Sequence, residues 1–177
     1  MPEHAVLTAV GPDKPGLVDA VSKFILECGG NLEDSRMAVL GGEFAMLILV
    51  SGSEAAMGKV LAGAEAAGAR AGLSLQARRT RAPEQAAASG TIPYALDAYS
   101  MDHPGIVQRI SHFLAERGIN VRALETRLSL APVTGQPLFS LHATLDVPSG
   151  VKVAQLRASL EAIGADENID VELKPGG

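Results

Sequence analysis

The chain has 177 residues, of which 47% are apolar, and its 15 basic and 20 acidic side chains give a net charge of −5. This is the composition of a folded globular protein, and the length allows one domain or two small ones. Because the chain is acidic and only 3% aromatic, it lacks the basic surface and the stacking rings that direct nucleic-acid binding requires.

The compartment is predicted from the cysteine count and the N-terminus. One cysteine, Cys28, excludes an internal disulfide and a cysteine-based zinc site. The N-terminus lacks the charged and apolar segments of a secretory signal, and no run of about 18 apolar residues is present to span a bilayer. We therefore expect a cytoplasmic protein that does not enter a membrane.

The sequence repeats with an offset of 89 residues. Residues 13–31 (DKPGLVDAVSKFILECGGN) align without a gap with residues 102–120 (DHPGIVQRISHFLAERGIN), and nine of the nineteen positions are identical. So dense a match indicates a duplication. We predict a first domain at 1–81, a linker at 82–91, where apolar periodicity is lost, and a second domain at 92–177.

In chain order, turn residues delimit the predicted elements of the first half. Pro15 suits the first position of a helix, where its missing N–H costs nothing. Gly29 follows that helix where a C-terminal cap requires positive φ, and Gly41-Gly42 is typical of a two-residue hairpin turn. The predicted elements are a strand at 4–10, a helix beginning at Pro15, strands at 31–40 and 43–51, a helix at 54–71 and a strand at 73–79.

The second half repeats this order, with Pro104 at the helix start and Gly118 at its end. Its predicted strands lie at 93–99, 119–130, 138–147 and 169–173, and its second helix lies at 151–163. Each half therefore has the predicted element order β-α-β-β-α-β. This pattern predicts an α+β protein with two ferredoxin-like domains, each an antiparallel sheet with its helices on one face.

The third strands of the two halves differ. Residues 138–147 alternate between apolar and polar side chains, as expected of a sheet with one solvated face. Residues 44–50 are apolar on both faces, so either Leu47 and Leu49 or their neighbours would face outward. We expect this outer face to pack on the other domain or in an oligomer, which makes a homodimer possible.

The Asp-x-Pro-Gly loops that precede the first helices are the candidate binding sites. Unpaired N–H groups at a helix N-terminus attract a carboxylate. Gly16 and Gly105 have no Cβ to block that approach, and Asp13 and Asp102 are acceptors for an ammonium group. The combination suits a zwitterionic amino acid.

Structural explanations remain open for the same residues. An Asp before a helix is an ordinary capping residue, and Asn31 and Asn120 are residues that tolerate a left-handed turn. The four histidines have no metal-site spacing and are interpreted as surface or turn residues, and Cys28 is expected to pack as a small hydrophobe. We therefore expect no catalytic residue, metal site or cofactor.

The two repeats resemble a known family. GPDKPGLVDAVSKFILECGGNLEDSRMAVLGGEFAMLILV and MDHPGIVQRISHFLAERGINVRALETRL are similar to the start of an ACT domain, the small regulatory module of amino-acid metabolism. Two tandem copies and nothing else resemble the glycine cleavage system transcriptional repressor family. The resemblance implies the β-α-β-β-α-β fold, association of the two domains side by side or face to face, and amino-acid binding at domain interfaces.

The resemblance also implies which residues bind the ligand. In ACT domains the ligand lies against the loop between the first strand and the first helix, and a polar residue that opens the second strand of the facing domain completes the site. The implied ligand-binding residues are Asp13, Lys14, Gly16, Leu17 and Asn31 of the first half, and Asp102, His103, Gly105, Ile106 and Asn120 of the second. Because His103 stands where the first half has Lys14, the two sites need not bind alike.

These features favour a non-enzymatic regulatory protein that senses a small amino acid, glycine or serine, and acts through a transcriptional regulator or an enzyme. One alternative is an ACT assembly module that binds no ligand. Another is a small ferredoxin-like enzyme, because fold does not decide function. A phosphatase of that fold needs a phosphate-cradling loop with an arginine, whereas Gly-Pro-Asp-Lys-Pro-Gly carries a carboxylate that repels phosphate.

Overall fold

The computed structural model describes residues 2–82, 90–132 and 134–176. The chain divides into two compact units, Met1–Ala87 and Ala88–Gly177, here called the first and second halves. Residues 83–89 of the predicted linker lie outside the described residues, so the linker and the domain boundaries stay predictions.

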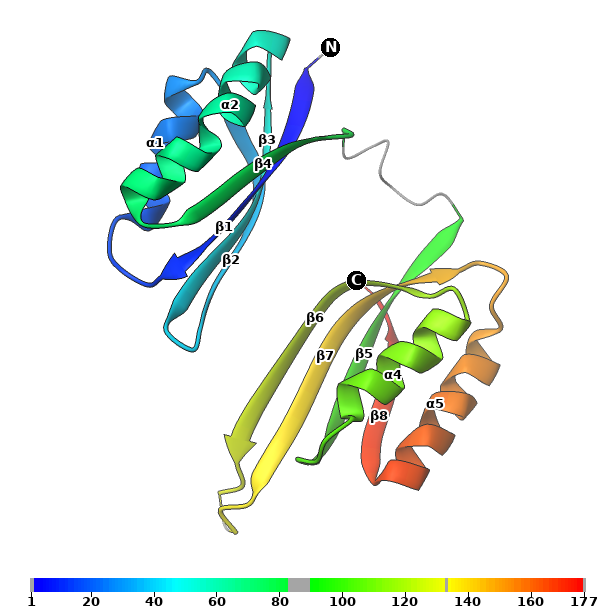
Figure 1. The fold of residues 1–177 in the computed structure, drawn as a ribbon. Coiled ribbons are helices and arrows are strands. Elements are labelled where there is room, and N and C mark those ends of the chain that lie inside the picture. Colours follow the sequence, from blue (N-terminus) through cyan, green and yellow to red (C-terminus); the bar gives the residue numbers. More distant parts are fainter. Residues whose placement is uncertain (1, 83–89, 133, 177) are drawn as a thin grey trace. The chain divides into compact units, whose positions relative to one another are not determined.

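The first half is a four-stranded antiparallel sheet with strand order β2-β3-β1-β4. Helices α1 and α2 lie on one of its faces (Figure 1). The elements are β1 (Glu3–Pro12), α1 (Leu17–Glu27), β2 (Asn31–Leu40), β3 (Glu43–Gly52), α2 (Glu54–Ala71) and β4 (Ser74–Thr80).

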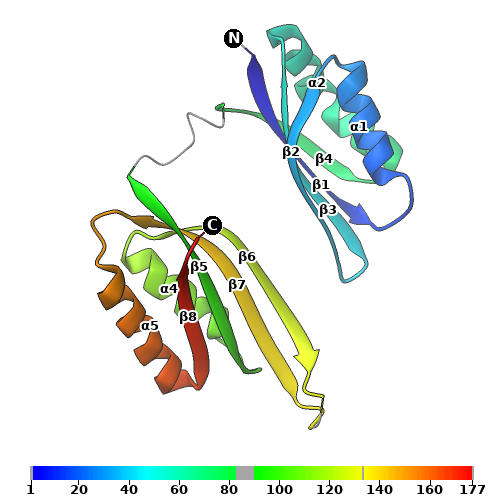
Figure 2. The same cartoon turned by 180° about the vertical axis from the view of Figure 1, so that it is seen from behind.

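The second half has the same architecture, with strand order β6-β7-β5-β8. Figure 2 shows the face of this sheet that α4 and α5 leave uncovered. Its elements are β5 (Thr91–Met101), α4 (Ile106–Glu116), β6 (Asn120–Leu130), β7 (Pro137–Pro148), α5 (Val153–Glu167) and β8 (Ile169–Pro175). The predicted α+β class and ferredoxin-like fold are confirmed in both halves.

Each half has its own aliphatic core between its helices and its sheet. In the first half, Leu7, Ile25 and Ile48 are almost fully buried, and Cys28 packs against this core as the sequence predicts. In the second half Leu96 of β5, at the repeat position of Leu7, is likewise buried in the core. Because aliphatic burial drives folding, each half forms a compact unit around its own core.

The turn residues behave largely as predicted, with one exception. Gly29 and Gly118 follow the first helices with φ of 81° and 65°, and the hairpin turn at Gly41 and Gly42 also has positive φ at both positions. The exception is the helix start. Both first helices begin two residues later than predicted, so Pro15 and its counterpart lie in the preceding turn.

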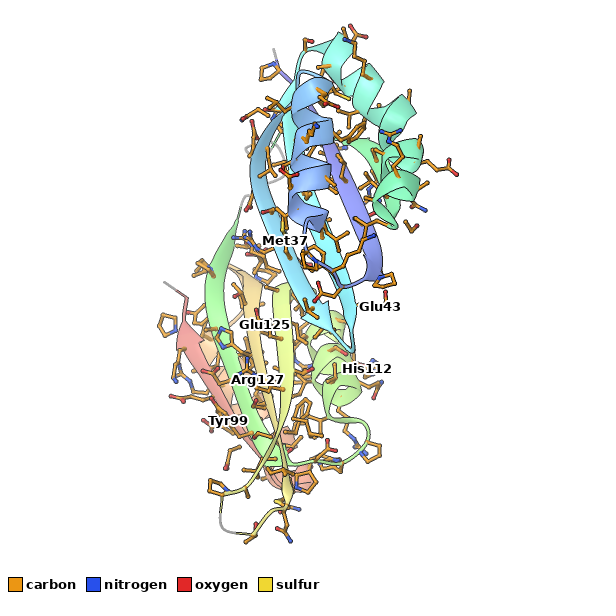
Figure 3. All side chains as sticks on the ribbon, turned by 90° about the vertical axis from the view of Figure 1, so that its left-hand side faces the viewer. Met37, Glu43, Tyr99, His112, Glu125 and Arg127 are labelled. Carbon is orange, nitrogen blue, oxygen red and sulfur yellow. The ribbon has the colours of Figure 1, made fainter. Side chains whose placement is uncertain are left out.

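The uncovered sheet faces of the two halves differ in chemistry. In the first half, Met46 and Ile48 point into the core, whereas Leu47 and Val10 are 48% and 50% exposed on the outer face. In the second half the alternation predicted for β7 holds as far as Leu145, but Asp146 is only 6% exposed. The outer face of this sheet is mostly polar, although Tyr99 is 56% exposed there. Figure 3 labels three residues of this second sheet, Tyr99, Glu125 and Arg127.

Two glycines of α2 make a matched test of packing. A Cβ on Gly68 would lie 2.5 Å from the Leu75 Cβ and 2.7 Å from the Leu73 carbonyl oxygen, whereas a Cβ on exposed Gly58 meets no described atom within 4 Å. We expect Gly68→Ala to lower the free energy of unfolding by about 1–3 kcal/mol. Gly58→Ala should raise it by up to about 1 kcal/mol. Denaturant unfolding measures both, and equal effects would contradict this packing.

Candidate functional site

The two Asp-x-Pro-Gly loops join the first strand of each half to its first helix. The amide of Asp13 donates to the carbonyl of Gly42 at 3.0 Å, and the amide of Asp102 donates to the carbonyl of Pro137 at 3.0 Å. Each loop is thereby tied to the end of the neighbouring hairpin. Both aspartates are exposed, so their carboxylates are accessible to a ligand.

A left-handed glycine, and not the aspartate, caps the helix that follows each loop. Gly16 and Gly105 are the N-cap residues, with φ of 90° and 101°, and neither helix has a side-chain capping hydrogen bond at its N-cap. The interpretation of Asp13 and Asp102 as ordinary capping residues is therefore wrong. The first amides of each helix retain their capacity to bind an anion. A Cβ on Gly16 would meet no described atom within 4 Å, so the backbone there is open to approach.

The residues that follow these glycines are buried in the hydrophobic cores. Leu17 and Ile106 are 3% and 2% exposed and belong to the cores of their halves. Their side chains anchor the helix N-termini, so contact with a ligand in the loop would use their backbone amides. The loop can therefore offer amides and a carboxylate, but little apolar surface.

The residue after each aspartate differs between the halves in structure as well as in sequence. The Nζ of Lys14 lies 3.0 Å from where a Cβ on Gly72 would be, beside the C-cap of α2. A cation is favourable at a helix C-terminus. His103 instead turns its Nδ1 toward the Pro104 carbonyl at 3.3 Å. When Nδ1 donates this hydrogen bond, the neutral ring presents Nε2 as an acceptor.

The second loop has unmet hydrogen-bonding capacity. Among the described residues, Ser100 Oγ and His103 Nε2 are the buried side-chain polar atoms that have no hydrogen-bond partner. Buried polar atoms are nearly always paired, because leaving them unpaired costs free energy. Ser100 precedes the loop on β5 at the repeat position of Gly11. We did not predict this residue as a site residue, although the difference between Gly11 and Ser100 is visible in the aligned repeats.

The two helix N-termini also differ in charge. Asp19 lies in the first turn of α1, whereas the first turn of α4 has no acidic residue. A carboxylate in the first turn competes with an anionic ligand for the positive end of the helix dipole. The second loop is therefore the more favourable of the two for a carboxylate.

The predicted asparagines lie at the far ends of their own sheets. Asn31 pairs with Ser51, which pairs with His4 near the start of β1, whereas Asp13 follows the end of that strand. A ten-residue strand is about 30 Å long. Asn31 and Asp13 of one half therefore cannot bind the same small ligand, and the same holds for the second half. A ligand that contacts both residue types would need two ACT domains.

Each asparagine lies at a sheet corner that also holds a buried ionisable group, which we did not predict as part of a site. Asn120 donates from Nδ2 to Asp146 Oδ2 at 3.4 Å, and Arg122 lies 3.2 Å from the other oxygen of this 7% exposed carboxylate. At the corner that contains Asn31 the charges are reversed: the buried residue is a histidine and the residue on the bulge is a carboxylate. There His4 Nε2 lies 3.5 Å from a carboxylate oxygen of Glu33.

Both corner pairs depend on a register shift in an edge strand, at Glu33 and at Arg122. Such β-bulges redirect side chains. His4 is 7% exposed, so the interpretation of this histidine as a surface residue is wrong. The two halves thus place opposite charges on equivalent bulges.

The outer face of the second sheet carries a further charged cluster. His142 Nδ1 lies 2.6 Å from Asp97 Oδ1, and Lys174 Nζ lies 3.4 Å from Asp97 Oδ2. The hydrogen bond from His142 is the main cause that lowers the pKa of Asp97, and Lys174 lowers it further, whereas burial opposes both. An Asp–His pair can carry acid–base chemistry, but this one lies at the centre of an open sheet.

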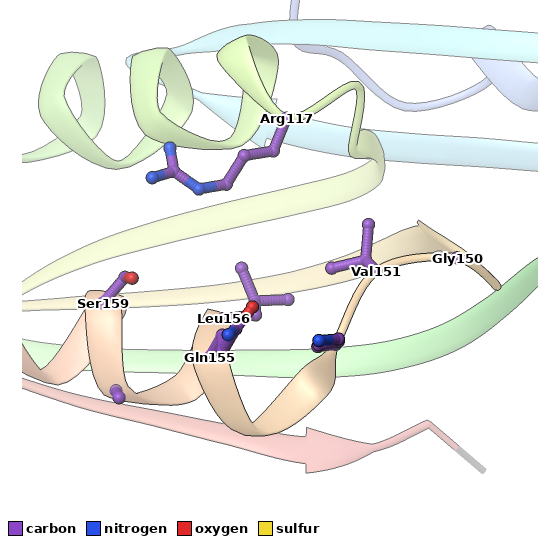
Figure 4. A pocket seen from close by; sticks show the side chains of 8 residues that line it. Arg117, Gly150, Val151, Gln155, Leu156 and Ser159 are labelled. Atoms are coloured by element: carbon purple, nitrogen blue, oxygen red, sulfur yellow. The ribbon is translucent and has the colours of Figure 1, made fainter.

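A separate cavity of about 630 Å³ lies between the C-terminal end of α4 and the start of α5. Arg117 from the α4 end and Gln155, Leu156 and Ser159 from α5 are among its lining residues (Figure 4). The guanidinium carbon of Arg117 lies 3.6 Å from the centre of the Phe113 ring. This cavity is at the opposite end of α4 from the Asp-x-Pro-Gly loop, so it belongs to a different site.

Within residues 2–82, 90–132 and 134–176, no group of three or more His, Cys, Asp or Glu side chains could hold a metal ion. No helix in these ranges is long and apolar enough to cross a membrane.

Comparison with known proteins shows which family the chain resembles. Residues 3–78 match the family model of the ACT domain, and the second half repeats the element order and strand order of the first. The first half is therefore similar to an ACT domain, and the second half has the same fold. It resembles the glycine cleavage system transcriptional repressor of Escherichia coli strain K12, with 27% identity over 165 residues, which cover 93% of this chain and 86% of that protein.

Solved structures match the fold of both halves together. An unknown protein from Galdieria sulphuraria matches with a TM-score of 0.82 and 27% identity, over all of both chains. The crystal structure of a proposed glycine cleavage system transcriptional repressor matches with a TM-score of 0.71 and 26% identity, covering 98% of this chain and 97% of that one. The resemblance to the repressor family therefore holds in sequence and in structure.

The Asp97 cluster gives a prediction of pH dependence. Because folding lowers the pKa of Asp97 below its ordinary 3.8, the carboxylate stabilises the fold fully at neutral pH and loses this effect as the pH falls below about 4. Asp97→Asn should lower the free energy of unfolding by about 1 kcal/mol at pH 7, and the difference from wild type should shrink at pH 3. Asp170→Asn, at an exposed position on the same face outside the cluster, is the control. A constant difference at both pH values would contradict this account.

Proposed function

We propose that this chain is a non-enzymatic regulator with two ACT domains, which binds a small amino acid at its Asp-x-Pro-Gly loops and acts through a partner protein. One observation carries the proposal. In both halves, an exposed aspartate that caps nothing stands beside a helix N-terminus that has no side-chain cap. The amides suit a carboxylate and the aspartate suits an ammonium group, which are the two charged groups of every amino acid.

The geometry favours a ligand with a small side chain, such as glycine or serine. Gly16 and Gly105 bring bare backbone to the loop, and the apolar side chains of Leu17 and Ile106 are turned into the cores. The loop therefore has no apolar pocket of its own for a large side chain. A second ACT domain would complete the site through an asparagine that opens a second strand, Asn31 or Asn120.

The second loop is proposed to bind more tightly than the first. Ser100 Oγ and His103 Nε2 lack partners there, and no first-turn carboxylate opposes the ligand. In the first half, Gly11 and Lys14 occupy the corresponding positions, and Lys14 lies beside the C-cap of α2.

Regulation would follow from the coupling of binding to domain arrangement. A ligand that contacts two ACT domains stabilises the arrangement that brings them together, and so shifts an existing equilibrium. A partner that recognises one arrangement would then gain or lose affinity. The net charge of −5 favours action through a transcriptional regulator or an enzyme over direct DNA contact. We propose that this takes place in the cytoplasm.

A thermal unfolding series with the common amino acids tests the proposal. Because a ligand that binds only the native state raises Tm, glycine or serine should raise it and large amino acids should not. Asp102→Asn should remove most of this increase, and Asp13→Asn should remove less. Both substitutions are at exposed positions, so Tm without ligand should change little.

The same unfolding series can also contradict the proposal. If millimolar glycine, serine and the other amino acids leave Tm unchanged, the protein is an assembly module and the sensor proposal is wrong. If Tm rises equally in wild type, Asp13→Asn and Asp102→Asn, a ligand binds elsewhere and the loop assignment is wrong.

A further inference from the structure

The cavity between the C-terminal end of α4 and the start of α5 is cationic. Arg117 and Lys152 line it together with the neutral polar side chains of Gln155 and Ser159, and in the described part of the chain none of its lining residues is acidic (Figure 4). On a chain with a net charge of −5, a concave surface with two cations and no carboxylate attracts anions. Its volume of about 630 Å³ is that of a site for a small molecule.

The first half lacks these charges at the corresponding corner. The repeat places Cys28 at the position of Arg117. Ser53 caps α2 through its side chain, and Glu54 follows it in the first turn. Helix α5 instead has Lys152 as its N-cap residue, with no side-chain capping hydrogen bond and no acidic residue in its first turn. Each of these differences makes the second half more favourable for an anion.

A longer connection opens the cavity in the second half. One residue separates β3 from α2, whereas four residues, 149–152, separate β7 from α5. In the first half a Cβ on Gly29 would lie 3.7 Å from the Cβ of Ala56, so the end of α1 packs closely on the start of α2. A Cβ on Gly118, the equivalent of Gly29, would meet no described atom within 4 Å. The cavity is therefore a feature of the second half and not a requirement of the fold.

Contacts with the last turn of α4 hold the side chain of Arg117 in place. Its guanidinium carbon lies 3.6 Å from the centre of the Phe113 ring, and its Nη1 donates to the Phe113 carbonyl at 3.1 Å. Glu116 approaches the same nitrogen at 3.8 Å, but both side chains of this pair are exposed, so the attraction is weak. The described contacts of Arg117 thus leave Nε and Nη2, which can bind two oxygens of one anion.

From these observations we propose that the cavity binds a small phosphate monoester, at a site that is separate from the Asp-x-Pro-Gly loops and independent of amino-acid binding. The charge of a phosphate dianion matches the two cations. The amides of Gln155 and Leu156 both donate to the carbonyl of Lys152. The earlier amides of α5, those of Val153 and Ala154, remain for a phosphate oxygen.

The rest of the lining favours an ester with hydroxyl groups. Gln155 and Ser159 lie on α5, next to the apolar side chains of Val151 and Leu156. Glutamine and serine side chains both donate and accept hydrogen bonds, so they suit hydroxyl groups. A free amino acid fits less well, because the described lining has no carboxylate to bind its ammonium group. The lining therefore indicates a phosphorylated polyol.

An NMR titration of the labelled full chain tests this site, with glycerol 3-phosphate as the probe. We expect saturable amide shift changes at Arg117 and in residues 150–156. Lys152→Ser, which restores the residue type of the first half, should raise Kd about tenfold or more because a charge-assisted hydrogen bond is lost. Arg117→Cys should act in the same direction. Serine is a preferred N-cap residue, so Lys152→Ser should not destabilise α5.

Lys59→Ser on α2 and Arg127→Cys on β6 are the matched controls, because both side chains are exposed outside the cavity. They change the net charge by the same amount as the cavity variants, and they should leave Kd unchanged. The proposal is overturned if millimolar probe gives no saturable shift at the cavity residues, or if the controls weaken binding as much as the cavity variants do. It is also overturned if inorganic phosphate binds as tightly as glycerol 3-phosphate, because the cavity would then not recognise an ester.

Discussion

A glycine in the left-handed region opens the first helix of each half, and the rest of the candidate site depends on it. With φ near 90° at Gly16 and Gly105, the chain turns from the sheet into the helix without a side-chain cap. A residue with a Cβ is strained in this conformation. The turn buries the next residue in the core, leaves the first helix amides to a ligand, and keeps the preceding aspartate at the surface.

The duplication separates what the fold requires from what each half does. Both halves need the same glycines, the same strand order and an aliphatic core. Their surfaces have diverged in charge and polarity. The bulge carries Glu33 in one half and Arg122 in the other, and the loop carries Lys14 or His103. Two copies of one scaffold can thus present a ligand-binding loop twice and differ in affinity and in partner surface.

The helices, strands and turns could be predicted from the sequence because apolar periodicity and turn residues determine local structure. The helix at 54–71 and the hairpin turn at Gly41-Gly42 follow from such signals and are confirmed. The helix starts were predicted two residues early. Proline tolerates the first helical position but does not require it, and the following left-handed glycine delays the helix. Sequence patterns do not distinguish these two geometries.

Burial of individual polar side chains was harder to predict. His4 and Asp146 occupy alternating strand positions that indicate solvent, yet both are under 10% exposed. Glu33 and Arg122 lie against them because of bulges, and a bulge is a tertiary feature that strand alternation does not reveal. The unpaired atoms of Ser100 and His103 likewise depend on how the loop packs on the sheet, so the difference between the two loops emerges only in the structure.

The central claim is that the Asp-x-Pro-Gly loops bind an amino acid, and NMR titration of the labelled chain with glycine and with serine tests it most directly. The account predicts that the largest amide shift changes occur in residues 102–106, with smaller ones in residues 13–17. Saturable shifts confined to other regions, such as the cavity around Arg117 and Ser159, would contradict it, as would a spectrum that does not change at millimolar ligand.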